Sequence, residues 1–385
     1  MIRSLFKLLC LTIAPFTMAQ NRIKIEIASL PPYHSKGNDI YVAGSFNGWN
    51  PQDSAWRFKK DRNGKEAIQF SLTDGRYEFK ITRGGWDRVE CGREGASIDN
   101  HNISVPGDTV ISVDVAEWSD RFPAKPKAST ASKNVHIIDE KFFIPQLKRT
   151  RRIWIYLPES YAKSKKRYPV LYLQDGQNIF DNATAYAGEW GVDEYFDSAA
   201  AKGIEAIVVA VDNGTVQRMN EYNPYDTKKF GKGEGGKYVD FLAKTLKPFI
   251  DKKYRTQADK VNTFIAGSSM GGLISLYALL KYPRLFGGAG IFSPSLCIAP
   301  KMFIEIKTTA PKVNSKIYFY AGKQEEEFMV RDMLKAFDIF QKSSKSPVKA
   351  VIRDDGRHNE ASWAREFPLF FEWLVNGDSI NKTRP

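Results

Sequence analysis

The feature that most constrains this chain is a serine in the glycine-rich turn Gly267-Ser268-Ser269-Met270-Gly271-Gly272. Residues 262–266 before the turn read as a short apolar strand, and residues 273–280 after it read as a helix. A G-x-S-x-G motif between a strand and a helix is typical of a sharp, strained turn that lifts the serine hydroxyl above a sheet. We therefore predict that Ser269 is a nucleophile and that Ser268 packs inward.

The C-terminal two thirds of the chain alternates predicted strands with predicted helices. The strand candidates are 152–157, 170–173, 206–211, 262–266, 316–321 and 349–353, and the helix candidates include 235–250, 271–281 and 329–342. This alternation predicts a mostly parallel sheet with helices on both faces. The expected fold class is therefore α/β for residues 135–377, with a short tail at 378–385.

Residues 38–118 follow a different pattern, in which short alternating stretches are separated by turn signals such as Asp74-Gly75. This pattern predicts a small all-β, immunoglobulin-like sandwich, with a hairpin formed by 65–72 and 77–82. We expect residues 20–37 to be a lead segment and the proline-bearing stretch 119–134 to be a linker. A length of 385 residues suits two domains.

The N-terminus has the pattern of a secretory signal peptide, residues 1–19. Arg3 and Lys7 precede an apolar run, and small residues around Ala19 suit cleavage before Gln20. The apolar run is shorter than the about 20 residues that span a bilayer, so we expect no stable membrane insertion after cleavage. The mature protein is expected to be secreted or periplasmic.

The formal net charge of +13 comes from basic residues that are scattered along the chain. Because export is also expected, we predict no nucleic-acid partner. After cleavage Cys91 and Cys297 remain, and they lie far apart in the sequence. We expect both to be free thiols that behave as small buried hydrophobes.

A serine hydroxyl needs a base and an orienting acid to act as a nucleophile. Among the four histidines only His358 follows Ser269, and the order serine, acid, histidine is typical of this motif. The acid is expected just after the predicted strand 316–321, where Glu325, Glu326 and Glu327 are candidates and Asp332 is a fallback. The acid would hold the imidazole in place and stabilise its charged form.

Two backbone N–H groups are expected to stabilise an oxyanion. One belongs to Met270, directly after the nucleophile, and the other to Gly176 or Gln177 in the loop after strand 170–173. Nothing in the sequence implies a metal or an organic cofactor.

At these residues the chain resembles the esterase family that includes feruloyl and acetyl-xylan esterases, bacterial siderophore esterases and mycolyltransferases. The resemblance covers residues 135–376, and further matching blocks are 172–181, 189–193, 218–224, 248–251 and 254–256. It implies an α/β-hydrolase fold and a serine carboxylic-ester hydrolase, with Gln177 as the second oxyanion donor and Glu325 as the acid.

The same resemblance bears on substrate binding. It places Trp190, Arg218 and Glu221 at the border of a substrate pocket, although aromatic and Arg–Glu pairs often only hold loops. Similar sequences usually carry an aromatic pair where this chain has Leu296-Cys297. The acyl-group preference is therefore left open.

The N-terminal domain resembles glycogen- and starch-binding modules over residues 38–116, through the blocks 42–49, 77–80, 85–86 and 98–100. The resemblance implies that Trp49 and Trp86 stack on sugar rings while Lys80 and Asn100 hydrogen-bond hydroxyl groups. An indole suits this role because it is flat and apolar with a polar edge. The alternative is that both tryptophans are sandwich core and that the module is a spacer.

Together these features predict a secreted serine esterase that removes feruloyl or acetyl groups from plant polysaccharide, with the module raising the local substrate concentration. A catecholate trilactone siderophore is an alternative substrate. Two other classes stay open: an acyltransferase, in which an alcohol replaces water, and a non-catalytic glycan-binding protein. The sequence does not indicate the oligomeric state.

Overall fold

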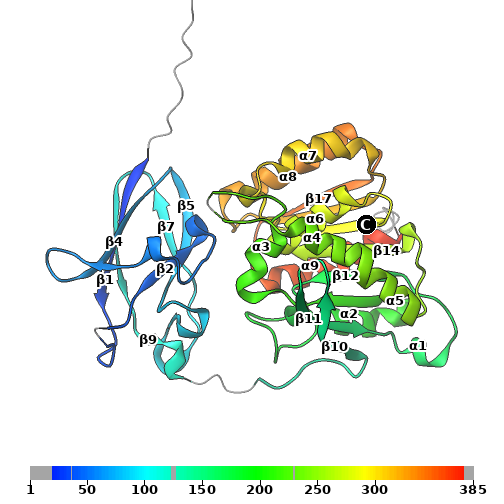
Figure 1. Ribbon diagram of the computed structural model, residues 1–385, viewed down its shortest axis with the longest axis horizontal. Coiled ribbons are helices and arrows are strands. Elements are labelled where there is room, and N and C mark those ends of the chain that lie inside the picture. The colour runs from blue at the N-terminus through cyan, green and yellow to red at the C-terminus, as the bar shows by residue number, and fades with distance from the viewer. Residues whose placement is uncertain (1–19, 36, 123–126, 229, 377–385) are drawn as a thin grey trace, which may run out of the picture. The chain divides into compact units, whose positions relative to one another are not determined.

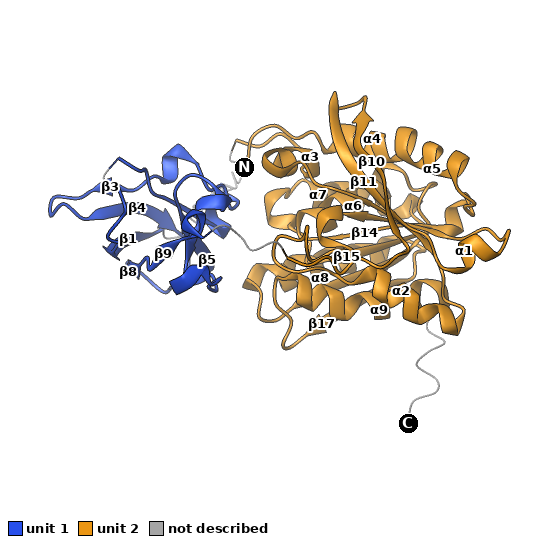
Figure 2. Cartoon of the chain, turned by 90° about the horizontal axis from the view of Figure 1, so that it is seen from below, with its two compact units in different colours: residues 1–123 blue, residues 124–385 orange. Residues whose placement is uncertain are grey.

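The computed structural model describes residues 20–35, 37–122, 127–228 and 230–376. The chain divides into two compact units, residues 1–123 and 124–385 (Figure 2). The division falls inside the stretch 119–134 that the sequence marks as a linker. The predicted signal peptide and the tail 378–385 lie outside the described residues.

The N-terminal unit is a β-sandwich whose two sheets have the strand orders β3-β4-β1-β8 and β2-β5-β7, with a separate pair β6-β9 (Figure 1). Apolar side chains from both sheets, including Ile25, Phe79 and Trp118, form one buried core. The strands are β1 (Asn21–Ser29), β2 (Tyr41–Gly44), β3 (Lys59–Lys60), β4 (Glu66–Leu72), β5 (Gly75–Thr82), β6 (Glu90–Cys91), β7 (His101–Val105), β8 (Thr109–Asp114) and β9 (Glu117–Trp118).

Strand β1 lies inside the sandwich, so the expectation that residues 20–37 form a separate lead was wrong. It pairs antiparallel with β4 and parallel with β8. Ile23, Ile25 and Ile27 alternate with polar residues and are buried, which is the period-two pattern of a strand with one face on a core. The turn signals that outline the predicted sandwich all lie C-terminal to β1, so they do not indicate this strand.

The expected hairpin of residues 65–72 and 77–82 is also wrong, because β4 and β5 belong to different sheets. Strand β4 pairs with β1 and β3, whereas β5 pairs with β2 and β7. The Asp74-Gly75 signal marks a chain reversal but does not specify the partner of the next strand. Although β4 and β5 belong to different sheets, each strand buries one face in the same core, as the buried side chains of Ile68 and Ile81 show.

The C-terminal unit contains an eight-stranded sheet with the order β10-β11-β13-β12-β14-β15-β16-β17. The strands from β13 to β17 are mutually parallel, and β10 and β11 add an antiparallel edge. The bounds are β10 (Val135–Ile144), β11 (Arg149–Tyr156), β12 (Val170–Gln174), β13 (Ile207–Val211), β14 (Thr263–Ser268), β15 (Gly288–Phe292), β16 (Lys316–Gly322) and β17 (Val348–Arg353).

Helices cover both faces of this sheet (Figure 1). One buried cluster joins the sheet to α4, α5, α6, α7 and α8, and a second joins its other face to α2 and α9. The helices are α1 (Ser160–Lys163), α2 (Val192–Ala199), α3 (Arg218–Tyr222), α4 (Gly235–Phe241), α5 (Lys247–Lys253), α6 (Met270–Lys281), α7 (Met302–Thr309), α8 (Glu327–Ser343) and α9 (Glu360–Asn376). The predicted α/β class with a mostly parallel sheet is confirmed.

Strands β10 and β15 were not predicted. Strand β15 has the sequence Gly-Ala-Gly-Ile-Phe, in which three small residues precede a single β-branched residue, so the usual strand signal is weak. Its glycines are required by packing, because a Cβ on Gly290 would lie 2.6 Å from the Phe370 ring and one on Gly288 would lie 2.5 Å from Leu374. Helix α9 therefore approaches the backbone of β15 closely.

Residues 129–134 of the expected linker are bound to the C-terminal unit through a series of carboxylates, which we call the carboxylate ladder. The Ser132 N–H donates to Asp193, which is fully buried at the start of α2. The ladder consists of Ser129 to Asp181 (2.9 Å), Thr130 to Glu189 (2.6 Å), Ser132 to Asp193 (2.7 Å) and Asn134 to Asp197 (2.7 Å).

Candidate active site

Ser269 lies between β14 and α6 in a backbone conformation with φ 56° and ψ −122°, which non-glycine residues rarely adopt. The neighbouring glycines make this turn possible. A Cβ on Gly267 would lie 2.7 Å from the backbone of Gly271, and a Cβ on Gly272 would lie 2.8 Å from the Phe292 carbonyl oxygen. The turn leaves Ser269 partly exposed while Ser268 is buried in the strand.

The structure brings Ser269, His358 and Glu325 into one hydrogen-bonded row. His358 Nε2 lies 3.0 Å from Ser269 Oγ, and His358 Nδ1 lies 2.8 Å from Glu325 Oε2. The three residues follow the carboxyl ends of β14, β17 and β16, which meet at the same edge of the parallel sheet. In this arrangement the imidazole can take a proton from the serine while the carboxylate holds the ring.

Glu325 is the carboxylate that contacts the histidine, and its own surroundings are closely defined. Its Oε1 accepts hydrogen bonds from the Gly322 N–H and from the Ser293 hydroxyl, both at 2.7 Å. The Trp363 indole N–H donates to Ser293 Oγ at 3.0 Å, and the Trp363 ring meets the His358 ring edge-on. Residues 326 and 327 cap and begin α8, and Asp332 pairs with Arg331 on that helix.

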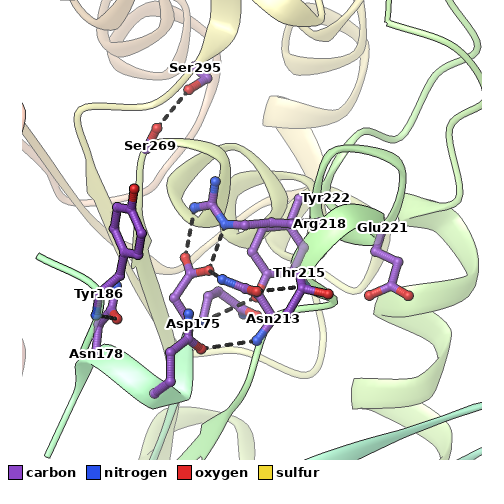
Figure 3. Close-up of polar contacts among 12 residues, drawn as sticks. Asp175, Asn178, Tyr186, Asn213, Thr215, Arg218, Glu221, Tyr222, Ser269 and Ser295 are labelled. Carbon is purple, nitrogen blue, oxygen red and sulfur yellow. Dashed lines mark hydrogen bonds and ion pairs between the residues drawn. The ribbon is translucent and has the colours of Figure 1, made fainter. Parts of the chain in front are cut away.

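A further serine touches the predicted nucleophile. Ser295 Oγ lies 3.1 Å from Ser269 Oγ (Figure 3). Neither Ser293 nor Ser295 was singled out as a site residue in the sequence. Both serines follow strand β15, which the sequence did not predict. Polar residues directly after a strand of a parallel sheet lie at the edge where such sheets carry their sites.

The two expected oxyanion donors lie at the starts of helical segments. Met270 is the first residue of α6, and the first N–H groups of a helix have no acceptor within it. Gln177 lies in the short 3-10 helix Gly176–Asn178 after β12. Gln177 Oε1 accepts the Asn213 N–H at 3.2 Å, and a Cβ on Gly176 would lie 2.9 Å from Asp212 N, so this loop packs tightly on the end of β13.

Asp175 holds the start of that loop. It has φ 56°, and its carboxylate accepts hydrogen bonds from Arg218 Nε at 2.6 Å and from Arg218 Nη2 at 2.8 Å (Figure 3). Asn213 Nδ2 also donates to it, at 2.7 Å. The sequence pattern alone does not indicate this role of Asp175.

The charges around Asp175 influence one another. Burial alone would lower the pKa of the Arg218 guanidinium, but the Asp175 carboxylate outweighs it and raises that pKa. Burial raises the pKa of Glu360, and Asp175 adds to this effect while His358 opposes it. Asn178 Nδ2 donates to Glu360 Oε1 at 3.1 Å, which connects the Gln177 loop to the first residue of α9.

Two of the three residues expected at a pocket border are interior instead. Trp190 is 5% exposed and packs on Phe292, Trp363 and Phe367. Glu221 is fully buried and pairs with Arg149 and Arg151 of β11. Both side chains therefore have structural partners: Trp190 belongs to an aromatic core, and Glu221 forms ion pairs with two arginines. Arg218 is the one of the three that lies in the network beside Asp175.

The residues expected to bind sugar all belong to the N-terminal unit, and the two tryptophans are neighbours there. The rings of Trp49 and Trp86 are 6.2 Å apart, and both tryptophans are half-buried rather than part of the buried core. Lys80 Nζ donates to the carbonyl oxygens of residues 98 and 99, and burial lowers the pKa of this lysine. Asn100 Nδ2 donates to Glu78.

The cysteines differ in their surroundings. Cys91 is a free thiol and is buried as expected, whereas Cys297 is exposed. The expectation of a buried Cys297 was therefore wrong. Across the ranges that the structure describes, no group of three or more His, Cys, Asp or Glu residues is arranged to hold a metal ion. No helix in those ranges is both long and apolar enough to cross a bilayer.

The sheet order, the strained serine turn and the residues at the carboxyl ends of the strands define an α/β-hydrolase. Within that class the chain belongs to the esterase family described as "Putative esterase", which matches residues 144–369. It is therefore an esterase, as the sequence predicts.

Three curated relatives each match part of the chain. YbbA of Bacillus subtilis, an uncharacterized protein, is 26% identical over 241 residues, which are 58% of this chain and 92% of that protein. An endo-1,4-beta-xylanase/feruloyl esterase of Xylanibacter ruminicola is 28% identical over 216 residues, which are 55% of this chain but only 27% of that protein. An alpha-amylase of Niallia circulans is 32% identical over 95 residues, which are 24% of this chain and 7% of that protein.

Among solved structures, the enterochelin esterase of Shigella flexneri covers 88% of this chain and 88% of its own chain, with a TM-score of 0.51 and 15% identity. At this identity the likeness supports the fold only.

Proposed function

We propose that the protein is an exported serine carboxylesterase that acts through an acyl-enzyme. The observation that carries the proposal is the position of His358, whose two ring nitrogens lie within hydrogen-bonding distance of Ser269 Oγ and Glu325 Oε2. In the first step Ser269 Oγ attacks the ester carbonyl carbon and its proton passes to His358 Nε2. The carbonyl oxygen becomes an oxyanion next to the N–H groups of Met270 and Gln177.

The acyl-enzyme then forms and is hydrolysed by the same groups. The tetrahedral intermediate collapses when the alcohol leaves with the proton from His358, and Ser269 carries the acyl group. His358 next takes a proton from water, which attacks the acyl carbonyl, and returns a proton to Ser269 Oγ as the acid is released. Glu325 keeps Nδ1 of the ring as the donor nitrogen throughout, so that Nε2 is free to exchange the proton.

The proposed substrate is a feruloyl or acetyl ester on plant polysaccharide. Two observations support it: the similarity to a protein named as a xylanase/feruloyl esterase, and a second unit on which Trp49 and Trp86 form an adjacent indole pair outside the core. A sugar-binding unit on the same chain would raise the substrate concentration near the site. Export accords with the signal pattern of residues 1–19.

The test combines a nucleophile variant with a substrate panel. In Ser269→Ala, hydrolysis of 4-nitrophenyl acetate and covalent labelling by a fluorophosphonate should both fall to background. Ser268→Ala, at the neighbouring buried position, is the matched control and should keep both. Wild-type rates in Ser269→Ala would refute the proposal.

The panel then compares product release from feruloylated arabinoxylan, acetylated xylan and a catecholate siderophore. Preference for either polysaccharide supports the proposed substrate. Preference for the siderophore would overturn that substrate assignment while leaving the serine esterase chemistry intact.

A further inference from the structure

The loop that follows β15 touches both ends of the row formed by Ser269, His358 and Glu325. At one end, Ser293 Oγ donates to Glu325 Oε1 at 2.7 Å. At the other end, Ser295 Oγ lies 3.1 Å from Ser269 Oγ. Ser295 is buried, with only 6% of its surface exposed, so its hydroxyl is held within the site rather than in solvent.

Backbone contacts fix this loop to the serine turn. The Ser269 N–H donates to the Phe292 carbonyl at 2.9 Å, and the Ser295 N–H donates to the Ser269 carbonyl at 3.1 Å. Ser293 has φ 42°, a conformation that costs energy for a residue with a side chain, and its N–H is bonded to the Tyr320 carbonyl at 2.7 Å. The Ser295 hydroxyl is therefore presented to Ser269 by a loop that is anchored on both sides.

The hydrogen-bond pattern determines which serine donates. Glu325 is acceptor-only when ionised, so His358 Nδ1 carries the proton and, in the neutral ring, Nε2 is an acceptor. The Ser269 O–H must then point to His358 Nε2. Ser269 Oγ has no proton left for the second contact, so the Ser295 O–H is the donor to Ser269 Oγ.

We propose that Ser295 is a further catalytic residue, whose hydroxyl donates a hydrogen bond to Ser269 Oγ and stabilises the negative charge that develops there as the proton leaves for His358. The proposal rests on Ser269 being the nucleophile. Hydrogen bonds to charged groups are stronger than those between neutral groups, so the contact is stronger in the transition state than in the resting enzyme. An interaction with that property raises kcat rather than only binding substrate.

The same hydroxyl acts in both half-reactions. During acylation Ser269 Oγ forms a bond to the carbonyl carbon and loses its proton to His358. In the acyl-enzyme Oγ is an ester oxygen, which is a weaker acceptor. During deacylation Oγ is the leaving group: its bond to carbon breaks, it keeps the electron pair and it regains a proton from His358. Ser295 stabilises the charge on Oγ in each case, and its own proton is not transferred.

The experiment measures pre-steady-state and steady-state hydrolysis of 4-nitrophenyl acetate by Ser295→Ala. We expect the acylation rate constant and kcat each to fall about 10- to 100-fold, the size of effect that follows loss of a hydrogen bond to a charged group. KM and the melting temperature should change little. Ser295→Thr, which keeps a hydroxyl, should recover most of the rate.

Ser275→Ala is the matched control, because Ser275 is a fully buried serine on α6 that is not in the row. It should retain the wild-type rate. Unchanged or faster acylation in Ser295→Ala would overturn the proposal, and so would equal losses in Ser295→Ala and Ser295→Thr, which would indicate a packing effect.

Fluorophosphonate labelling separates this proposal from the one on which it rests. The label should be found by mass spectrometry on Ser269 in the wild type, and it should form on Ser269 more slowly in Ser295→Ala. Label on Ser269 at an unchanged rate in the variant refutes the role of Ser295 alone. No label on Ser269 in the wild type refutes the proposed nucleophile.

Discussion

Asp175 and Arg218 form a two-bonded ion pair directly before the Gln177 loop, with Nε and Nη2 of the arginine 2.6 and 2.8 Å from the two carboxylate oxygens. Asp175 also adopts a left-handed backbone conformation, which costs about 1–2 kcal/mol for a residue with a side chain. Strained residues persist where the surroundings over-determine them. The ion pair therefore fixes the direction in which the chain enters the loop that carries Gln177.

We predict that Arg218→Lys lowers kcat for 4-nitrophenyl acetate by about tenfold or more, because a lysine cannot reproduce the two parallel hydrogen bonds and small displacements of catalytic groups are costly. Arg365→Lys is the matched control. Arg365 forms the same kind of pair with Asp355, but both side chains are exposed. Equal activities in the two variants would contradict a role for the Asp175–Arg218 pair.

Replacing Glu325 should have a far larger effect than replacing its neighbours. Glu325→Gln keeps the shape of the side chain but removes its charge and permits the wrong histidine tautomer, for which the expected loss in kcat is about 10³- to 10⁴-fold. Glu326→Gln and Glu327→Gln should remain close to wild type, since neither residue is in the row. Loss of activity in Glu326→Gln with retention in Glu325→Gln would reverse the assignment of the acid.

The parts of the fold that the sequence predicts are those with a local signal. Buried parallel strands such as β13, Ile-Val-Val-Ala-Val, are runs of β-branched residues, and α6 directly follows a recognisable turn. Strand β15 has no such signal, because its small residues are dictated by the closeness of α9, a long-range contact. The partners of β4 and β5 were missed for the same reason: a turn motif describes the chain locally and not its neighbours in space.

In the site, chain order alone was enough to identify His358 as the histidine that lies next to Ser269. Chain order could not distinguish among the three consecutive glutamates. A shift of one residue along the chain decides which carboxylate points to the imidazole of His358 and which residue begins α8. Trp190 and Glu221 show why residue type alone does not reveal burial. Their residue types suit a pocket, but burial depends on partners such as Phe367 and Arg151 that are distant in the sequence.

The indole pair of the N-terminal unit provides a test of sugar binding. We predict that Trp49→Ala and Trp86→Ala each weaken retention on a starch or xylan affinity gel by about tenfold, which corresponds to about 1.4 kcal/mol. Hydrolysis of 4-nitrophenyl acetate should be unchanged, because this small ester does not need the sugar-binding unit. Val110→Ala is the control. Val110 is an exposed apolar residue on β8, which belongs to the sheet β3-β4-β1-β8. Full retention by both tryptophan variants would leave the unit as a spacer.

Stability should depend on pH through Asp193. Burial and a hydrogen bond with the Glu194 carboxyl raise the pKa of Asp193 to about 8, compared with about 3.9 for an exposed aspartate. Between these two values the folded chain holds a proton that the unfolded chain releases, so this residue's contribution to stability falls as the pH rises from about 4 to about 8. Asp193→Asn removes this loss, so its melting temperature should rise relative to wild type across that interval.

Asp355→Asn is a control of opposite sign. A hydrogen bond from Arg365 lowers the pKa of Asp355, so its small contribution to stability is present above about pH 4 and is lost below its folded pKa. The check is a series of thermal melts at fixed ionic strength from about pH 2 to pH 9, so that the changes at both aspartates fall within the range. A constant difference between Asp193→Asn and wild type over the whole range would contradict the predicted linkage.

The carboxylate ladder has a mechanical consequence when the two units are held by different partners and the segment between the units is under tension. A pulling force applied through the N-terminal unit would load four hydrogen bonds in turn, because each donor residue is bonded to its own carboxyl group. The order along the chain is Ser129, Thr130, Ser132 and Asn134. The bonds would be loaded one after another, as in peeling, rather than all at once. Each rupture would lengthen the connecting segment and lower the tension, so the esterase sheet, whose first strand β10 begins at Val135 directly after the ladder, would be protected from the force.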